Sequence, residues 1–374
     1  MKNSLVSEGS ARRDVALYLS RTDLAEHDWA SQTFIATSLA ALHGVAYAGV
    51  CGRDTGETAP GRYFVPTGTI VGNDQAAALG IHDQSDLFGG VVPHGFVCTK
   101  AITHGLVAKN AEAPDGWSPA FGDRVASSTL AGFTAFTEAD ALIACRRLLA
   151  LGKVRLKSVH GIAGRGQWVI EDERAFHAAM AEQDHSALSQ CGIVLEQHLY
   201  DVVTYSVGHI CVGDLTASYV GTQSLTQDNE GNEVYGGSQL HIARGGFDAL
   251  SKRNLSAVQR RAVEQAEVYD AAALSCFPGL IASRRNYDTV GGKDARGNPL
   301  SGVLEQSWRS GGATPAELLA LDAFAADDAL DFVTASTVEC YGEPHPIPKN
   351  ANVYFTGVDS KVGAMTKYAF LELP

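Results

Sequence analysis

The chain has 374 residues, of which 45% are hydrophobic and 19% charged, so it is long enough for two or three packed lobes around a sizeable core. Its formal net charge of −13 argues against nonspecific binding to nucleic acid or to an anionic membrane, because both need a basic surface. No stretch approaches the roughly 18 uninterrupted apolar residues of a membrane span, and the polar segment Met1–Arg13 lacks the apolar core of a leader peptide. We therefore expect a cytoplasmic protein with no membrane or nucleic-acid partner.

The first hundred residues alternate strand and helix signals. Residues 15–19 and 45–50 are apolar and predict strands, and between them apolar residues recur with helical spacing up to His43. Asp28 is placed to cap this helix. A strand–helix–strand order predicts a parallel sheet in an α/β lobe. The second of two predicted loops, 52–62 and 109–120, precedes the end of this first domain, which we place at residues 1–130.

A smaller unit follows, which we place at residues 131–199. Thr137, three residues before Asp140, predicts the start of a helix. Residues 154–159 predict a strand, which leads into a glycine-rich loop and then into a strand, a helix and a strand. This order is typical of a small lid that folds over a ligand.

The remaining residues, 200–374, form the predicted third and largest domain. A pair of strands is expected at 202–211 and 216–225, and a long helix at 256–274. Another helix should begin at Thr314, where an N-cap, a first-turn proline and the capping-box residue Glu317 coincide. The seven cysteines are scattered without metal-ligand spacing, which favours reduced thiols over disulfides or a zinc site.

The first chemical motif is a strand lysine, Lys157, followed by the glycine loop with Gly161, Gly164 and Gly166. Glycines let backbone N–H groups approach phosphate oxygens, and the lysine adds a positive charge. The loop lacks the Gly-Lys-Ser/Thr ending of a Walker motif, and it leads into a strand where the dinucleotide fingerprint would open a helix. The motif taken alone is more often a glycine-rich hairpin turn with a solvated lysine than a phosphate-binding loop.

The second motif is a polar hairpin with Asp288 on one strand and Glu305 on the next. Antiparallel pairing would bring the two carboxylates together, and magnesium prefers oxygen ligands that it shares with ATP phosphates. Ser307 and Arg309 follow at spacings of two, so they share the strand face of Glu305. Ser307 would supply a third oxygen, and Arg309 would grip a phosphate. The alternative interpretation is a hairpin with exposed charges.

Together these segments resemble the ATP-grasp superfamily over about residues 132–312, and the preceding lobe is similar to a pre-ATP-grasp domain. The resemblance implies an α/β, three-lobed ATP-grasp fold. Three segments also resemble a bacterial ATP-grasp branch known only as a domain of unknown function: Val92-Pro93-His94-Gly95-Phe96, Gly161-Ile162-Ala163-Gly164-Arg165-Gly166-Gln167 and Val303-Leu304-Glu305-Gln306-Ser307-Trp308-Arg309. This narrower resemblance implies no particular activity.

The superfamily resemblance implies a role for each matching residue, with ATP and Mg²⁺ as cofactors. The residues implied to contact the phosphates of ATP are Lys157, Gly161, Gly164, Gly166 and Gln167. Those implied to meet adenine are Glu196, Gln197 and Leu199, with Asp201 or Thr204 near the ribose. Those implied to hold magnesium are Asp288, Glu305 and Ser307. The anion site would contain Arg309, with Arg244, Arg284 and Arg285 as further candidates.

Two departures from the family pattern bear on activity. The family usually has Asn where Ser307 stands, and serine is a shorter and weaker metal ligand. The family's second phosphate lysine has no clear equivalent, with Lys100 and Arg124 as the nearest candidates. Either change is compatible with altered metal handling or with a lost activity.

The leading functional hypothesis is a ligase that uses ATP to activate a carboxylate for attack by an amine or similar nucleophile. Its partners would be small molecules, and because many relatives pair through their large lobes a homodimer fits the resemblance. A small-molecule kinase, a non-catalytic or regulatory ATP-binding protein and a purely structural protein are the alternatives. Turnover would distinguish a ligase or a kinase from a non-catalytic ATP-binding protein, and a purely structural protein would bind no ATP.

Overall fold

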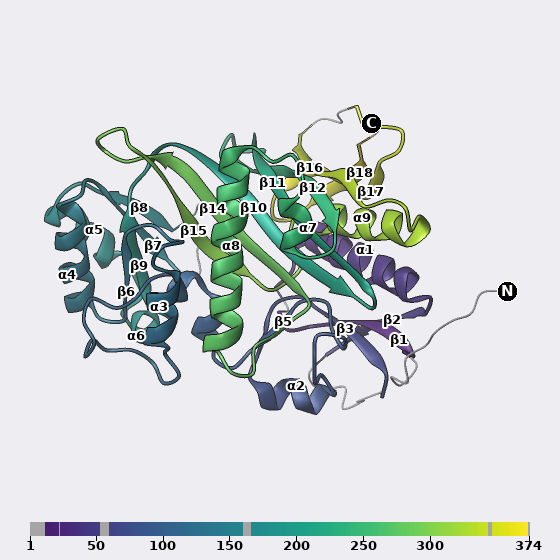
Figure 1. The fold of residues 1–374 in the computed structure, drawn as a ribbon, viewed down its shortest axis with the longest axis horizontal. Coiled ribbons are helices and arrows are strands. Elements are labelled where there is room, and N and C mark those ends of the chain that lie inside the picture. Colours follow the sequence, from purple (N-terminus) through teal and green to yellow (C-terminus); the bar gives the residue numbers. More distant parts are fainter. Residues whose placement is uncertain (1–11, 22, 53–59, 160–165, 343–345, 373–374) are drawn as a thin grey trace.

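The computed structural model describes residues 12–21, 23–52, 60–159, 166–342 and 346–372 (Figure 1). The predicted phosphate-binding residues Gly161 and Gly164 lie outside the described residues. Within the described chain the strands form an N-terminal sheet, a small sheet, a large sheet and a short three-stranded sheet. No helix in these ranges is both long and apolar enough to span a bilayer.

The N-terminal sheet has the predicted parallel strand–helix–strand order. Strand β1 (Asp14–Tyr18) lies between β2 (Ala46–Cys51) and β3 (Arg62–Pro66), and both pairings are parallel. Helix α1 (Glu26–His43) connects β1 to β2 and buries Ile35 and Leu39 against the core. The prediction of a parallel sheet is confirmed.

The start of α1 differs from its prediction. The helix begins at Glu26, so Asp28 lies inside its first turn, and the N-cap residue Ala25 has no side-chain hydrogen bond to offer. A carboxylate of Asp359 takes that place, because it accepts a hydrogen bond from the backbone amide of His27 at 3.0 Å. A cap supplied from 332 residues away leaves no local signal in the sequence.

The small sheet is antiparallel and has the order β6-β9-β7-β8. Its strands are β6 (Gly132–Ala135), β7 (Val154–Ser158), β8 (Gln167–Ile170) and β9 (Ile193–Gln197). Helices α4 (Glu138–Leu149), α5 (Glu173–Ala181) and α6 (His185–Cys191) complete this part of the chain. Thr137 caps α4 as predicted, accepting a hydrogen bond from the amide of Asp140 at 3.1 Å.

The large sheet has the order β15-β14-β10-β11-β12-β16-β18-β17 and is antiparallel throughout. Its strands are β10 (Tyr200–Val212), β11 (Leu215–Gln227), β12 (Glu233–Arg244), β14 (Arg284–Lys293), β15 (Pro299–Ser307), β16 (Phe332–Tyr341), β17 (Asn352–Asp359) and β18 (Gly363–Leu371). Helices α7 (Phe247–Ser251) and α8 (Ala257–Cys276) pack on one face. Helices α9 (Thr314–Ala326) and α1 cover the other (Figure 1).

Short elements join the three larger sheets. The three-stranded sheet combines β4 (Ile70–Val71) and β5 (Gly90–Val92) with β13 (Ile281–Ala282) from the later part of the chain. Helix α2 (Asn73–Leu79) lies between β4 and β5, and η1 (Gly95–Cys98), η2 (Lys100–Thr103) and α3 (Pro119–Val125) lead from β5 to the small sheet. The side chain of Gln306 on β15 donates to the carbonyls of Val97 and Thr99, each at 2.8 Å. These contacts fix η2 beside β15, while the domain boundaries at 130 and 199 stay predictions.

Candidate active site

The two predicted metal-binding carboxylates lie directly opposite each other on neighbouring strands. Strands β14 and β15 pair so that Asp288 faces Glu305, and a register shift separates this pair from the next pair, Thr289 and Val303. Leu304 is the extra residue of this β-bulge. Without it, Asp288 would face Leu304, and Glu305 would face Tyr287 and point to the α8 side of the sheet. The bulge therefore places both carboxylates on one face.

The charges around this pair are only partly balanced by the protein. Gln223 on β11 donates to a carboxylate oxygen of Asp288 at 3.0 Å. Lys100, whose side chain is 4% exposed, places its ammonium 3.3 Å from a carboxylate oxygen of Glu305. Burial, followed by the neighbouring charge of Glu305, raises the pKa of Asp288 to about 7. A divalent cation between the two carboxylates would remove this repulsion.

The donor set fits magnesium. Mg²⁺ is commonly bound by one or two protein carboxylates, with phosphate oxygens and waters completing its shell. Asp288 and Glu305 supply two such carboxylates, and Ser307 lies two residues farther along β15, opposite Asn286. Among the described residues, no group of three or more His, Cys, Asp or Glu side chains is arranged to hold a metal. An ion at this pair would therefore depend on oxygens from a bound phosphate.

A buried polar network supports the same sheet face beside the carboxylates. Arg284 on β14 forms an ion pair with Glu317 on α9, with 2.6 Å between guanidinium nitrogen and carboxylate oxygen. Tyr219 also donates to Glu317, at 2.7 Å, and Arg284 donates to the carbonyl of Arg309 at 2.6 Å. The predicted capping role of Glu317 is therefore wrong: α9 begins at Thr314 without a side-chain cap, and Glu317 binds Arg284 in the core.

Two of the predicted anion-binding arginines lie apart from the carboxylate pair. Arg244 donates to the carbonyls of Leu330 at 3.0 Å and Asp327 at 2.8 Å, beyond the end of α9. Arg285 is paired at 3.0 Å with Asp270 of α8. Because alternate residues of β14 point to opposite faces, Arg285 lies on the α8 side, away from Asp288. The structure therefore places Arg244 and Arg285 away from the carboxylate pair, and the role of Arg309 stays a prediction.

The predicted phosphate lysine belongs to a buried group of three side chains on the small sheet. The Lys157 ammonium contacts one carboxylate oxygen of Glu196, and His104 Nε2 lies 3.2 Å from the other. His104 rests against the backbone of Gly132, where an added Cβ would lie 2.6 Å from the imidazole ring. Burial opposes ionisation of Glu196, but the charge of Lys157 and the hydrogen bond from His104 outweigh it and lower the pKa to about 2.

This low pKa predicts an acid-dependent loss of stability. The ordinary pKa of a glutamate is 4.5, so the stability that ionised Glu196 contributes is fully present above that pH. This stabilisation falls as the pH drops toward about 2. The difference in unfolding free energy between wild type and Glu196→Gln should shrink by about 2 kcal/mol between pH 5 and pH 3. Urea unfolding at both pH values measures it. A difference that stays constant would show that Glu196 is not held in its ionised form.

The remaining predicted nucleotide contacts lie at the junction of the small and large sheets. Gln197 ends β9 and donates its backbone amide to the carbonyl of Ala131 at 2.8 Å. Leu199 is buried in an apolar cluster with Leu130, Val290, Leu300 and Leu304. Asp201 has a left-handed φ of 49° and pairs with Lys293 at 2.8 Å on the surface. Gly166 directly precedes β8 and Gln167 is its first residue, and the Arg155 guanidinium donates to the side-chain amide oxygen of Gln167 at 3.0 Å.

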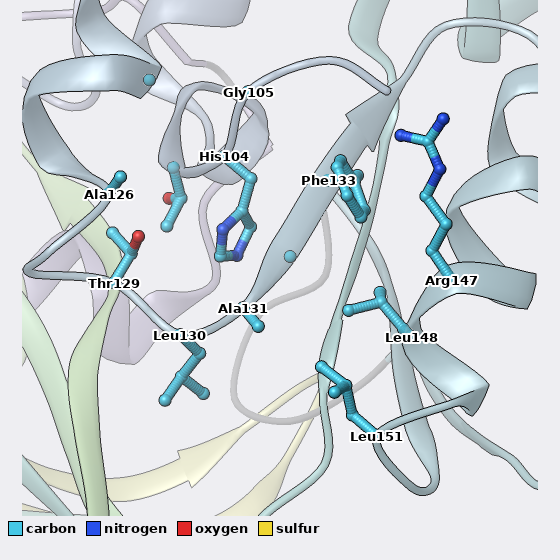
Figure 2. A pocket seen from close by; sticks show the side chains of 13 residues that line it. His104, Gly105, Ala126, Thr129, Leu130, Ala131, Phe133, Arg147, Leu148 and Leu151 are labelled. Carbon is cyan, nitrogen blue, oxygen red and sulfur yellow. The ribbon is translucent and has the colours of Figure 1, made fainter. Parts of the chain in front are cut away.

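A cavity of about 340 Å³ lies near this junction but does not include the carboxylate pair. It is bordered by the linker 129–132, by Phe133 and by Arg147, Leu148 and Leu151 from the α4 region (Figure 2). His104 lines it and reaches Glu196 beyond it. The cavity therefore adjoins the lysine-bearing sheet from the side of α3 and α4.

The sequence left the second phosphate lysine open between two residues, and the structure separates them. Lys100 lies beside Glu305, whereas Arg124 donates to Ser275 on α8. His104 and Gln223 were not singled out from the sequence. His104 lies in a loop that is distant from Glu196 in the sequence, and Gln223 is one of several polar residues on β11. Neither residue is therefore marked by a local sequence pattern.

Comparisons with known proteins place the fold. The model of the family described as "Protein of unknown function (DUF3182)" matches residues 15–369. A search of the curated proteins gave no match. Three solved structures resemble the chain over most of its length. N5-carboxyaminoimidazole synthetase from Staphylococcus aureus with ADP has a TM-score of 0.54 and 9% identity, and the match covers 97% of this chain and 94% of that one. Phosphoribosylglycinamide synthetase from Anaerococcus prevotii has a TM-score of 0.52 and 9% identity (96% and 94% covered), and the biotin carboxylase domain of Hydrogenobacter thermophilus 2-oxoglutarate carboxylase with MgADP has a TM-score of 0.50 and 12% identity (97% and 87% covered). The chain has the ATP-grasp fold, as its sequence predicts.

Proposed function

The chain belongs to the DUF3182 family, and from that premise we propose that it is an ATP- and magnesium-dependent ligase that activates a carboxylate for attack by an amine or a similar nucleophile. The observation that carries the proposal is the carboxylate pair Asp288 and Glu305, brought onto one face by the bulge, with Lys100 beside it. The fold supports it, because similarly folded proteins include a synthetase solved with ADP and a biotin carboxylase domain solved with MgADP. Both substrates would be small molecules.

In the proposed reaction a carboxylate oxygen of the substrate attacks the γ-phosphorus of ATP. The bond between that phosphorus and the β–γ bridging oxygen breaks, giving ADP and an acyl phosphate. The nucleophile then attacks the acyl carbon, loses a proton, and expels inorganic phosphate. No covalent enzyme intermediate is needed, so the protein positions the reactants and neutralises charge.

The residues divide this work by their positions. Asp288 and Glu305 would hold magnesium, which supplies charge neutralisation at the phosphates when bound. Lys100 and Lys157 would bind phosphate oxygens from two sides, and Arg309 would hold the transferring phosphoryl group. In the described structure Lys157 contacts Glu196 and Lys100 contacts Glu305. ATP binding would therefore draw each lysine from its carboxylate partner toward a phosphate.

The direct test of this function is a trapping assay. The protein is incubated with Mg-ATP, hydroxylamine and a panel of carboxylic acids, and ADP, phosphate and hydroxamate are measured. A ligase gives hydroxamate together with ADP when the right acid is present. Phosphorylation of a hydroxyl group would favour a kinase, and nucleotide binding without any turnover would favour a regulatory protein. Ser307, where the family usually has Asn, is the feature that favours the regulatory alternative.

Lys157→Met should raise the dissociation constant for ATP by about ten-fold or more, because it removes a charged hydrogen-bond donor to phosphate. The substitution also leaves Glu196 buried without its main partner, so it should destabilise the fold as well. The double variant Lys157→Met/Glu196→Gln separates the two effects, since it is expected to regain stability without regaining affinity. Calorimetric titration with ATP measures the affinities, and an unchanged dissociation constant would exclude Lys157 from the site.

A further inference from the structure

Arg21 stands at the carboxyl edge of the N-terminal sheet. Strands β1 and β3 are parallel, so the residues that follow them meet at one edge. The backbone amide of Arg21 donates to the Thr67 hydroxyl at 2.9 Å, and that hydroxyl donates back to the Arg21 carbonyl at 3.1 Å. The arginine stem passes close over Gly68, where an added Cβ would lie 3.3 Å from its Cδ. The position of Arg21 is therefore fixed by the sheet.

The segment that carries Arg309 is held against the same N-terminal part of the chain. Gly90 approaches Trp308 so closely that an added Cβ would lie 2.8 Å from the Trp308 Cβ. On the other side of Arg309, the Ser310 hydroxyl donates to the Gln32 side chain of α1 at 3.0 Å. Arg309 thus lies between two contacts to elements that flank the N-terminal sheet.

The charges of the two arginines are poorly neutralised. The two positions are close in space, because a Cβ added at Gly89 would lie 3.8 Å from Cδ of Pro66, the residue before Thr67, and 3.9 Å from Cα of Arg309. Arg284 has Glu317 as a buried partner, but in the described part of the chain the hydrogen bond found for the Arg309 guanidinium is to the carbonyl of Ser310, at 2.9 Å. Arg21 pairs with Asp23 at 3.5 Å, with side chains 40% and 80% exposed, which is a weak interaction in water.

We propose that Arg21 and Arg309 together bind an oxyanion, a carboxylate or a phosphate, of the non-nucleotide substrate. This inference rests on the proposed function and makes the substrate an acid that lies at the carboxyl edge of the N-terminal sheet. Two planar guanidinium groups match the oxygens of such an anion with paired hydrogen bonds. A bound anion would also remove the repulsion between them. Arg21 would then determine specificity, while Arg309 serves the transferring group.

The test uses orthophosphate and malonate as probes, titrated into the full-length protein both free of nucleotide and saturated with Mg-ADP. Arg21→Met keeps the length of the side chain and removes its charge. It should raise the dissociation constant of the tighter-binding probe by about ten-fold or more, and leave Mg-ADP affinity within about two-fold. The probe that wild type binds more tightly identifies the oxyanion as phosphate or carboxylate. Arg146→Met is the matched control, since Arg146 is also a surface arginine with one carboxylate partner.

Unchanged probe affinity in Arg21→Met would overturn the proposal, and so would a wild-type protein that binds Mg-ADP but neither probe. Arg21→Lys provides a second variant, which keeps the charge without the planar fork and should bind the probe with intermediate affinity. If wild type failed to bind Mg-ADP, the proposed function would fall. The nucleotide-free titrations would still decide the role of Arg21, so the two failures are distinguishable.

Discussion

Glu305→Gln is expected to lower magnesium-dependent turnover by about a thousand-fold while the protein stays folded. The substitution removes one of the two carboxylates that the Leu304 bulge brings onto one face of the sheet. Glu305 is 38% exposed on its side chain, so the neutral amide that replaces its carboxylate stays accessible to water and the fold should be kept. Turnover is measured with the acid identified by the hydroxamate assay, across a range of magnesium concentrations.

The matched control for this variant is Glu171→Gln. Glu171 is also a surface carboxylate paired with one lysine, Lys153, but it directly follows β8 of the small sheet. It should keep wild-type turnover and magnesium dependence. If Glu305→Gln behaved like Glu171→Gln, the assignment of the metal to the β14–β15 hairpin would be wrong.

Glu317→Ala should lower the free energy of unfolding by about 3–5 kcal/mol, because it leaves Arg284 charged and buried without its partner. Both side chains are almost inaccessible, at 2% and 0% exposed. Tyr219 also loses its hydrogen-bond acceptor. Urea unfolding of the variant and wild type at neutral pH measures the change.

The double variant Arg284→Met/Glu317→Leu tests the reason for this loss. It replaces the ion pair by apolar side chains of similar size, so it should be less destabilised than Glu317→Ala. It also removes the hydrogen bond from Arg284 to the carbonyl of Arg309, and turnover should remain reduced even where stability is regained. A change below about 1 kcal/mol in Glu317→Ala would contradict the buried pair.

The parts of the site that sequence could predict are those defined by local patterns. The strand at Lys157 and the two strands of the β14–β15 hairpin follow from apolar runs separated by glycine and turn residues. The pairing of Asp288 with Glu305 is consistent with that hairpin. The register of this pairing depends on the bulge at Leu304, and no residue type in the strand predicts that bulge.

The parts that sequence could not predict depend on contacts between distant segments. The cap of α1 comes from Asp359, and the partner of Glu317 is Arg284 rather than the backbone of its own helix. The family resemblance makes Arg285 a further candidate for the anion site, yet strand alternation turns it toward Asp270. Lys100 differs from Arg124 because Gln306 on β15 bonds to the backbone beside η2, and this contact brings Lys100 next to Glu305.

The most direct test of the central claim is a calorimetric titration of ATP into the protein with and without magnesium. The Asp288–Glu305 pair predicts micromolar binding that requires magnesium and that loses this requirement, together with most of its affinity, in Glu305→Gln. ATP binding of equal strength with and without magnesium, or no binding at all, would contradict the claim and make the two carboxylates ordinary charges of a surface hairpin.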